Sequence, residues 1–288
     1  MKEQEYKIEI VKSFELVDIF DCGQCFRWNK GQDGSYTGTF KGNVMNVQKQ
    51  GDTVTFKGIC NGDIKEIVED YFDLNRNYEE IKERLSKIDN HVKTSIEYGQ
   101  GIRILNQDLW EMIISYIISA NNNIPRIKGI IDRISKNYGK EVEWNGEKYY
   151  TFPTPEELKD VTIEDYRKLG AGFRDIRLYE TVHMVLDKKV NLNEMQNNPN
   201  TLEVREQLLT LSGVGPKVAD CILLFSTLKR FEVFPIDVWV RRVMNDLYIK
   251  KQDETKVNKK ELEKLAQEKF GNLAGIAQQY LFYWKREA

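Results

Sequence analysis

The first hundred residues alternate hydrophobic and polar side chains with the period of β-strands. Tyr6, Ile8 and Ile10 alternate with polar residues, and so do Val54 and Phe56, as expected for half-buried strands. Glycine-containing turn signals separate the candidate strands at residues 31–35, 41–43 and 48–52. The N-terminal part of the chain is therefore predicted to form an antiparallel β-sheet.

A helical pattern occupies about residues 63–88 and returns from about residue 99 to the end of the chain. Segments 108–120 and 216–228 are hydrophobic almost all round, which is typical of buried helices. Amphipathic helices are predicted at residues 127–137, 155–169, 174–187, 201–211 and 258–270. We therefore expect an α+β fold, in which a β-rich domain (residues 1–98) with a few helices precedes an all-α domain (residues 99–288).

The composition is that of a globular protein without a strong overall charge. The 288 residues include 41% hydrophobic and 31% charged side chains, and the net charge is −2. Such a chain can bury a sizeable core, but any nucleic-acid binding has to come from locally placed groups. We find neither a secretory leader nor an apolar run of the roughly 18 residues that a membrane span needs. A cytoplasmic protein is expected.

Cysteine and histidine give little support for metal or redox chemistry. Cys22 and Cys25 have the spacing of a redox or zinc motif, but Cys60 and Cys221 do not form a second pair. Small residues in a turn are the favoured interpretation. Because the chain has two histidines, a catalytic triad is not supported either. The chemistry is expected to use Lys, Asp, Glu, Tyr or backbone groups.

A glycine turn joins two predicted helices in the segment LSGVGPKVADC (211–221). Pro216 stands at the first position of the second helix, where proline is favoured. The turn Gly213-Val214-Gly215 lets the backbone approach another molecule closely. Its N–H groups at a helix N-terminus are suited to hold a phosphate. Taken alone, this turn is a weak signal of function.

Lys217 and Asp237 are the candidate reactive pair. The helix dipole and the apolar helix behind Lys217 are both expected to lower its pKa, which would supply a nucleophilic amine. The alternative is a surface lysine whose stem lies along apolar surface. The helix spans about 18 Å and residues 229–236 can reach about 26 Å, so Asp237 can return beside Lys217. Asp237 is also predicted to be a helix N-cap, which is compatible with catalysis.

Five motifs along the chain resemble those of a known enzyme family. They are GQCFRW (23–28), RILNQD (103–108), SANNNIPRI (119–127), KLGAGFR (168–174) and GVGPKVADC (213–221). Together they resemble the helix–hairpin–helix DNA glycosylases, and in finer detail the eukaryotic-type 8-oxoguanine DNA glycosylase/AP lyases. The resemblance spans essentially the whole chain. It implies an antiparallel, TBP-like β domain before the helical body.

The resemblance implies a role for each member of the reactive pair. Lys217 matches the lysine that attacks C1′ of the damaged nucleoside, expels the base and forms a Schiff base that allows strand cleavage. Asp237 matches the aspartate that assists base loss. The implied substrate is double-stranded DNA with 8-oxoguanine opposite cytosine, and the lesion has to be flipped out of the stack.

The resemblance also implies a pocket for the flipped base. Gly23 matches the glycine whose carbonyl accepts from N7–H of 8-oxoguanine; in guanine, N7 would place a second acceptor against this carbonyl. Gln278 matches the residue that bonds the Watson–Crick edge. Phe282 and Cys221 match the residues on the two faces of the base.

A second group of residues matches those that read the base opposite the lesion. Asn121, Arg126 and Arg174 match the groups that contact the orphaned cytosine. Phe173 stands where animal members have a tyrosine wedge, and it keeps the stacking face without the hydroxyl. Trp239 stands where those members have a histidine on a phosphate, and it can replace that histidine only as a donor.

The family comparison further implies how the hairpin is used. Its glycine turn is expected to bind a DNA phosphate through N–H groups, and its carbonyls could hold a monovalent or calcium ion. No metal and no iron–sulfur cluster is required, because no cysteine follows Cys221. This excludes the cluster-bearing endonuclease III branch. We expect a monomer that acts in the cytoplasm of a bacterium or archaeon.

Two other functions remain compatible with parts of the sequence. An alkylpurine DNA glycosylase shares the aspartate and the β-containing domain, but usually lacks the hairpin lysine. A non-catalytic helix–hairpin–helix module would grip the DNA backbone without needing Lys217 together with Asp237.

Overall fold

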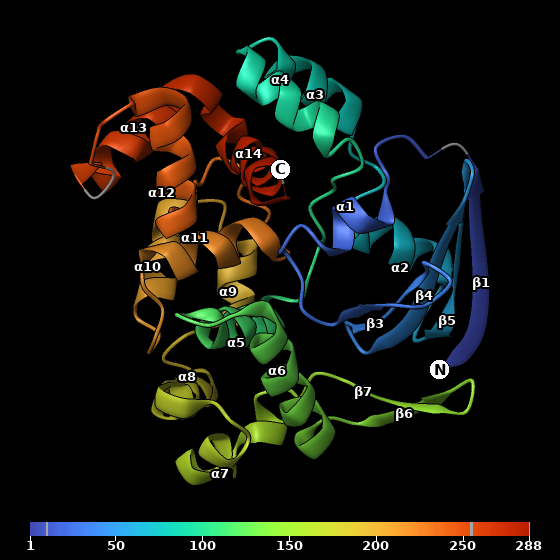
Figure 1. Cartoon of the computed structure of the whole chain (residues 1–288). Coiled ribbons are helices and arrows are strands. Elements are labelled where there is room, and N and C mark those ends of the chain that lie inside the picture. The colour runs from blue at the N-terminus through green and yellow to red at the C-terminus, as the bar shows by residue number, and fades with distance from the viewer. Residues whose placement is uncertain (10, 254–255, 288) are drawn as a thin grey trace.

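The N-terminal part of the chain forms the predicted antiparallel sheet (Figure 1). The computed structural model describes residues 1–9, 11–253 and 256–287, so the predicted strand position Ile10 lies outside the described residues. The sheet order is β1 (Lys2–Glu9), β5 (Thr53–Cys60), β4 (Asn43–Gln50), β3 (Tyr36–Phe40) and β2 (Trp28–Lys30). Tyr6 pairs with Phe56 and Ile8 with Val54. The alternating hydrophobic positions of the two strands therefore lie on one face.

Aromatic side chains fill the space between this face and helices α1 (Leu16–Phe20) and α2 (Ile64–Tyr71). Ring centroids lie 4.4 Å apart for Phe20 and Trp28 and 3.9 Å apart for Phe40 and Tyr71. Burial of each such ring contributes about 1.5–3 kcal/mol. The sheet and its two helices thus have a core of their own.

The rest of the chain is mainly helical (Figure 1). The longer helices are α3 (Tyr78–Ser86), α4 (Asn90–Tyr98), α5 (Leu109–Ser119), α6 (Ile124–Tyr138), α7 (Ile163–Lys168), α8 (Asp175–Leu186), α9 (Leu192–Asn197), α10 (Thr201–Leu209), α11 (Pro216–Phe225), α12 (Val238–Met244), α13 (Lys259–Phe270) and α14 (Ala274–Glu287). The short ones are η1 (Glu156–Leu158), η2 (Gly172–Arg174), η3 (Asn245–Ile249) and η5 (Gly271–Leu273). Ten residues of α5 are buried, which confirms it as a central helix.

Side-chain caps fix where three of the helices begin. The carboxylates of Asp108 and Asp237 accept from the amides of Glu111 and Val240, each at 2.8 Å, at the starts of α5 and α12. Asn123 caps α6 in the same way. Each cap contributes about 1 kcal/mol. These caps determine the first residues of α5, α6 and α12, which hydrophobic periodicity alone does not specify.

The helical stretch predicted at residues 63–88 and the helix predicted at residues 155–169 are each divided in the structure. The stretch 63–88 contains α2 and α3, because Asp73 adopts a left-handed conformation (φ 52°) and Asn77 caps a new helix. The stretch 155–169 contains only η1 and α7, and a capping box at Thr162 and Asp165 starts the second. Polar residues that hydrogen-bond their own backbone favour turns and caps over a helix interior.

The prediction that all of residues 99–288 are helical is wrong at one hairpin. Strands β6 (Glu141–Trp144) and β7 (Glu147–Tyr150) pair antiparallel beneath the main sheet (Figure 1). Between them, Asn145 and Gly146 both have positive φ (53° and 76°), as a two-residue hairpin turn requires. The Asn-Gly pair was the signal for this hairpin.

Helices α3 and α4 connect the two parts of the molecule. They fall within the first predicted domain, yet Leu85 and Val92 are buried in the same core as Tyr280 of α14. In Figure 1, α3 and α4 accordingly lie over α14 and away from the sheet. The division at residues 98 and 99 stays a prediction.

A buried ion pair joins the sheet part to the helical part. Asp73, which follows α2, lies 3.1 Å from Lys229, which follows α11. The Lys229 ammonium also donates to the carbonyl of Ile104, and Tyr78 donates to Asp73 at 3.0 Å. Burial lowers the pKa of Lys229 to about 8, and Asp73 opposes this decrease. The pair therefore depends on the close packing of both parts.

Replacing Lys229 with methionine should lower the free energy of unfolding by about 2–3 kcal/mol, because the buried Asp73 carboxylate loses a cationic partner. The control is Lys87→Met, which breaks an exposed pair with Glu83 and should change stability by less than about 0.5 kcal/mol. Urea denaturation of both variants measures the difference. Equal stabilities would contradict the role of the buried pair.

Candidate active site

The turn between α10 and α11 has the geometry of a phosphate-binding hairpin. Gly213 has φ +84°, and a Cβ there would lie 2.7 Å from the Arg177 side chain. Gly215 is the N-cap of α11, where open space surrounds it and it has no side chain to cap the helix. Pro216 occupies the first turn, as predicted. The first N–H groups of α11 thus remain available to an anion.

Lys217 lies half-buried at the start of α11, beside the ring of Tyr116. Its Nζ is 5.6 Å from the ring centroid. Cys221, one helical turn further on, raises the pKa of Lys217 most; burial lowers it, and the Asp237 carboxylate raises it. The expectation of a lowered pKa is therefore wrong, because these two neighbours outweigh burial.

The two neighbours do not act equally at neutral pH. Burial raises the pKa of the Cys221 thiol to about 11, so the thiol is neutral near pH 7. Asp237 is then the charge that stabilises the Lys217 ammonium. The chain therefore returns as predicted, with Asp237 both the N-cap of α12 and an electrostatic partner of Lys217.

Residues from opposite ends of the chain meet at the predicted base pocket. Gly23 has φ +90°, and a Cβ there would lie 3.8 Å from the Phe282 ring and 3.0 Å from the Arg286 guanidinium. Gln278 is 5% exposed, and its Oε1 has no hydrogen-bond partner among the described residues. Cys221 is buried nearby on α11. Gln278 thus carries a buried acceptor that a ligand could satisfy.

Tyr116 links the hairpin side of the site to the Gly23 side. Its ring faces Lys217, and its hydroxyl lies 3.5 Å from the carbonyl of Gln24. Burial raises the pKa of Tyr116 well above its ordinary value, so the phenol stays neutral. From the sequence, Tyr116 is predicted only as part of a buried helix. Its hydroxyl within an otherwise apolar segment was the available signal.

Three buried glutamines, for which no role was predicted, hold the Gly23 segment. Gln24 donates to the carbonyls of Ile19 and Arg103, at 2.8 and 2.7 Å. Gln107 bridges the carbonyls of Gln24 and Phe225, at 2.8 and 3.0 Å. Gln279 donates to the carbonyl of Cys22 at 2.7 Å. Gln24 and Gln107 lie within the quoted motifs, but spacing alone did not indicate these contacts.

The residues predicted to read the opposite base form a second cluster. Phe173 is 55% exposed, and its ring centroid lies 4.2 Å from the Arg174 guanidinium. Gly172 brings Arg126 and Arg174 close together, since a Cβ there would lie 3.5 and 4.0 Å from their guanidinium groups. Asn121 is exposed, with a left-handed backbone (φ 52°). Four predicted residues thus lie together, and three of them, Asn121, Arg126 and Phe173, are exposed.

Arg174, which matches a residue that contacts the orphaned cytosine, is deeply buried, and that contact stays a prediction. It is 1% exposed, and its guanidinium donates to the carbonyls of Ala120, Asn121 and Ala171. Burial lowers its pKa, as do the nearby cations Arg126 and Arg177. Arg174 therefore braces the turn that carries Asn121. The clustered cations make this surface locally positive despite the net charge of −2.

Trp239 projects from the first turn of α12, next to Asp237. It is 54% exposed, and its ring centroid lies 5.8 Å from the Arg242 guanidinium. An exposed indole can donate from its N–H and can stack. The phosphate contact stays a prediction.

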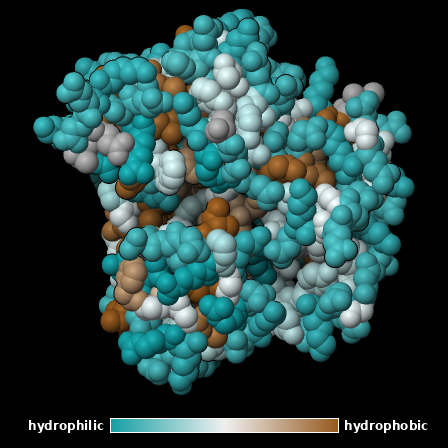
Figure 2. Space-filling view, viewed as in Figure 1, coloured by the Kyte–Doolittle hydropathy of each residue, from teal (hydrophilic) through white to brown (hydrophobic). Residues whose placement is uncertain are grey.

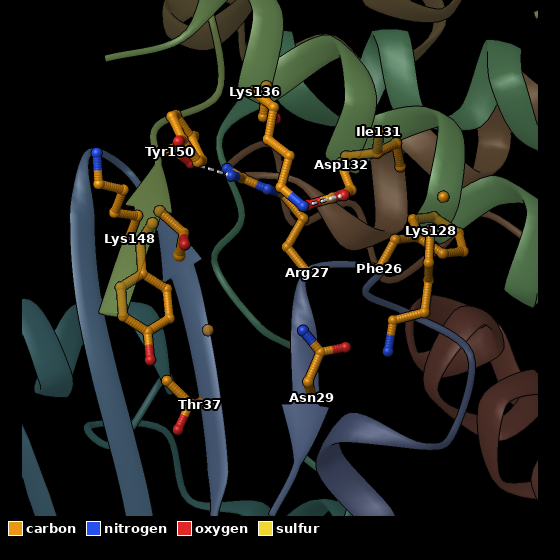
Figure 3. A pocket seen from close by; sticks show the side chains of 15 residues that line it. Phe26, Arg27, Asn29, Thr37, Lys128, Ile131, Asp132, Lys136, Lys148 and Tyr150 are labelled. Atoms are coloured by element: carbon orange, nitrogen blue, oxygen red, sulfur yellow. Dashed lines mark hydrogen bonds and ion pairs between the residues drawn. The ribbon is translucent and has the colours of Figure 1, made fainter. Parts of the chain in front are cut away.

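A cavity of about 430 Å³ lies elsewhere, between α6 and strands β2, β3 and β7 (Figure 3). Three of its four cations are ion-paired, namely Arg27 with Glu111, Lys136 with Asp132 and Lys148 with Glu141. The fourth, Lys128, donates to the carbonyl of Trp28. None of the predicted site residues lines it. The face seen in Figure 2 is hollowed near its centre, where hydrophobic side chains show among polar ones.

The cysteines favour a structural role. All four are free and buried, and burial raises the pKa of the Cys22 thiol to about 12, so Cys22 carries no thiolate near pH 7. The described residues contain no cluster of His, Cys, Asp and Glu that could hold a metal. An ion on the carbonyls of the hairpin stays a prediction.

Comparison with known proteins decides the family. Residues 7–113 match the family model of the 8-oxoguanine DNA glycosylase N-terminal domain, and residues 114–270 match that of the HhH-GPD superfamily of base excision DNA repair proteins. The chain is 31% identical to a probable N-glycosylase/DNA lyase of Methanothermobacter thermautotrophicus, over 78% of this chain and 76% of that protein. The chain belongs to the 8-oxoguanine DNA glycosylase family.

Solved structures agree with this assignment. The glycosylase superposes on the apo 8-oxoguanine glycosylase/lyase of Clostridium acetobutylicum with a TM-score of 0.91, 44% identity and 98% coverage of both chains. For a complex of that enzyme with double-stranded DNA containing cytosine opposite 8-oxoguanine, the TM-score is 0.92 and the sequence identity is 44%. The match covers 100% of this chain and 98% of that one. A 3-methyladenine DNA glycosylase of Archaeoglobus fulgidus, 23% identical with a TM-score of 0.77 and 98% coverage of both chains, shares the fold. In the described part of the glycosylase, every helix is too short or too polar to cross a bilayer.

Because the Asp237 carboxylate raises the pKa of Lys217, Asp237→Asn should lower the midpoint at which Lys217 titrates. In the wild type this midpoint should lie above that of an ordinary lysine. NMR titration of ¹³C-methylated lysines measures both, with Lys217→Arg assigning the signal. An unchanged or higher midpoint in Asp237→Asn would contradict the electrostatic pairing.

Proposed function

We propose that this protein is a bifunctional DNA glycosylase/AP lyase that excises 8-oxoguanine, preferably opposite cytosine. The observation that carries this proposal is Lys217 at the mouth of the hairpin, paired electrostatically with Asp237 and lying against the Tyr116 ring. A module that only grips the DNA backbone has no use for a half-buried amine next to a fixed carboxylate.

In the first chemical step, the amine of Lys217 replaces the damaged base at C1′. The lesion is flipped out of the stack, at a cost of a few kcal/mol. The Lys217 ammonium loses its proton, and the free amine forms a bond to C1′ while the C1′–N9 bond breaks. The base leaves with the bonding electrons and takes up a proton. Asp237 stabilises the positive charge that develops on the sugar.

The second step cleaves the strand. The C1′–O4′ bond opens to give a Schiff base between Lys217 and C1′. Loss of a proton from C2′ then expels the 3′ phosphate by β-elimination. Hydrolysis of the Schiff base releases the lysine for another cycle.

Recognition of the lesion rests on hydrogen-bond polarity. The Gly23 carbonyl accepts from N7–H of 8-oxoguanine, which guanine lacks, and Gln278 bonds the Watson–Crick edge. Phe282 and Cys221 enclose the two faces of the base. The unpartnered Oε1 of Gln278 and the Phe282 ring, which would lie 3.8 Å from a Cβ on Gly23, support this assignment.

Recognition of the opposite strand uses the second cluster. Asn121 and Arg126 contact the orphaned cytosine, and Phe173 takes the place of the flipped base as a wedge. Arg174 supports the Asn121 turn and contributes positive charge. The exposure of Phe173 and the packing of Arg174 against the carbonyl of Asn121 support these roles.

The hairpin Gly213-Val214-Gly215 binds a DNA phosphate through backbone N–H groups, and its carbonyls hold a monovalent or calcium ion. The proposed reaction requires no metal. The protein acts as a monomer in the cytoplasm, on chromosomal DNA. The relatives from Methanothermobacter thermautotrophicus and Clostridium acetobutylicum are named as glycosylase/lyases, which supports the DNA substrate.

Lys217→Gln should abolish strand cleavage and covalent capture by borohydride on an 8-oxoguanine duplex, because the amide cannot form a Schiff base. Lys264→Gln, which removes an exposed lysine of α13, should leave both unchanged. Gel analysis of the trapped complex measures the capture. An undiminished adduct with Lys217→Gln would exclude the proposed mechanism.

Arg126→Ala should reduce the preference for cytosine over other opposite bases by about tenfold, because a charged contact to a base edge contributes about 1–3 kcal/mol. Arg133→Ala, on the same helix but bonded to the carbonyl of Leu169, should keep the preference. Single-turnover excision from duplexes with each opposite base measures the ratio. If the preference in Arg126→Ala equals that of the wild type, Arg126 is not the reader.

A further inference from the structure

Two side chains of α14 that the proposed mechanism does not use grip the turn that carries Gly23. Gln279, which is 2% exposed, donates to the carbonyl of Cys22 at 2.7 Å. Arg286 donates to the carbonyl of Asp21, and its guanidinium lies 5.4 Å from the centroid of the Phe282 ring. Two consecutive carbonyls just before Gly23 are therefore fixed by one helix.

The carbonyls of this turn are almost all occupied. Those of Ile19 and Phe20 accept from Gln24 and from the thiol of Cys25. The carbonyls of Asp21 and Cys22 are held by α14, as described above, and that of Gln24 accepts from Gln107. Within the described residues, the carbonyl of Gly23 accepts from none. It is the acceptor in this run that a ligand can use.

The peptide groups on both sides of this acceptor are held in place. Before it, Gln279 and Arg286 hold the chain, and Arg286 lies so close that a Cβ on Gly23 would be 3.0 Å from its guanidinium. After it, the side-chain amide of Gln24 accepts from the N–H of Leu105 at 2.9 Å and donates to the carbonyl of Arg103. Rotation of the Gly23 carbonyl would break these contacts, although glycine itself permits it.

We infer that Gln279 and Arg286 are positioning residues that aim the Gly23 carbonyl into the base pocket, and so set the specificity for purines with a hydrogen-bond donor at N7. Both belong to the helix that carries Gln278 and Phe282, so the groups that read different edges of the base share one rigid frame. This inference rests on the proposed function and deepens it.

The test compares two reactions that differ in whether they need base recognition. Gln279→Met and Arg286→Met should each slow single-turnover excision of 8-oxoguanine by about tenfold, because the Gly23 acceptor is no longer held in position. Strand cleavage at a preformed abasic site should stay within about twofold of the wild type, because that reaction has no base to recognise. Arg286→Lys, which keeps a donor, should restore part of the excision rate.

The matched control is Lys285→Met. It removes the neighbouring cation of α14, which pairs with Asp246 at the surface, and should leave both reactions unchanged. In a Lys217→Gln background, the ratio of Kd for guanine duplex to Kd for 8-oxoguanine duplex should fall by about the same factor in the two test variants. The Lys285→Met control should leave this ratio of Kd values unchanged.

Three results would overturn the inference. Equal losses in excision and abasic-site cleavage would show that the two residues only support the fold. Faster excision by Arg286→Met would show that Arg286 blocks the pocket. If the wild type excises 8-oxoguanine and the variants excise it at the same rate, only this inference is contradicted. If the wild type excises no 8-oxoguanine, the proposed function is contradicted. If Gln279→Met does not fold, Arg286→Met and Arg286→Lys decide.

Discussion

The site depends on hydrogen bonds from buried side-chain amides to the backbone around Gly23. Gln24, Gln107 and Gln279 come from three separate segments, yet all bond the chain at residues 19–24 or its neighbours. A buried amide left unpaired costs about 1–3 kcal/mol, so each bond forms only when sheet, α5, α11 and α14 are correctly packed. The geometry of the pocket is thus a consequence of the assembly of both cores.

Charge in this protein is placed locally. The chain as a whole is slightly acidic, but Arg126 and Arg177 lie near the buried Arg174, whose pKa is lowered by burial and by these two cations. At the reactive centre the arrangement is reversed, since the Asp237 carboxylate stabilises the Lys217 ammonium. The resting enzyme therefore holds a protonated lysine, and the amine becomes nucleophilic only after it loses this proton.

Much of the fold could be predicted from hydrophobic periodicity, because strands and long helices each bury one face. The hairpin around Asn145 was missed, because its signal is a turn and not a periodic pattern. The motifs indicated which residues come together, but the pKa direction of Lys217 and the burial of Arg174 were not predicted. Cys221 lies one helical turn from Lys217 and its effect was overlooked, whereas Asp237 is brought close to Lys217 only by folding. Arg174 is buried against the backbone carbonyls of Ala120 and Asn121, and sequence spacing does not specify those contacts.

The proposed reaction requires that Lys217 is the lysine that bonds to DNA. The chain offers a clear competitor, because burial lowers the pKa of Lys229 to about 8, while Lys217 has a raised pKa. The measurement is peptide mapping by mass spectrometry of the complex trapped with borohydride on an 8-oxoguanine duplex. We expect the sugar remnant on Lys217. A remnant on Lys229 or on any other amine would contradict the proposed role of Lys217.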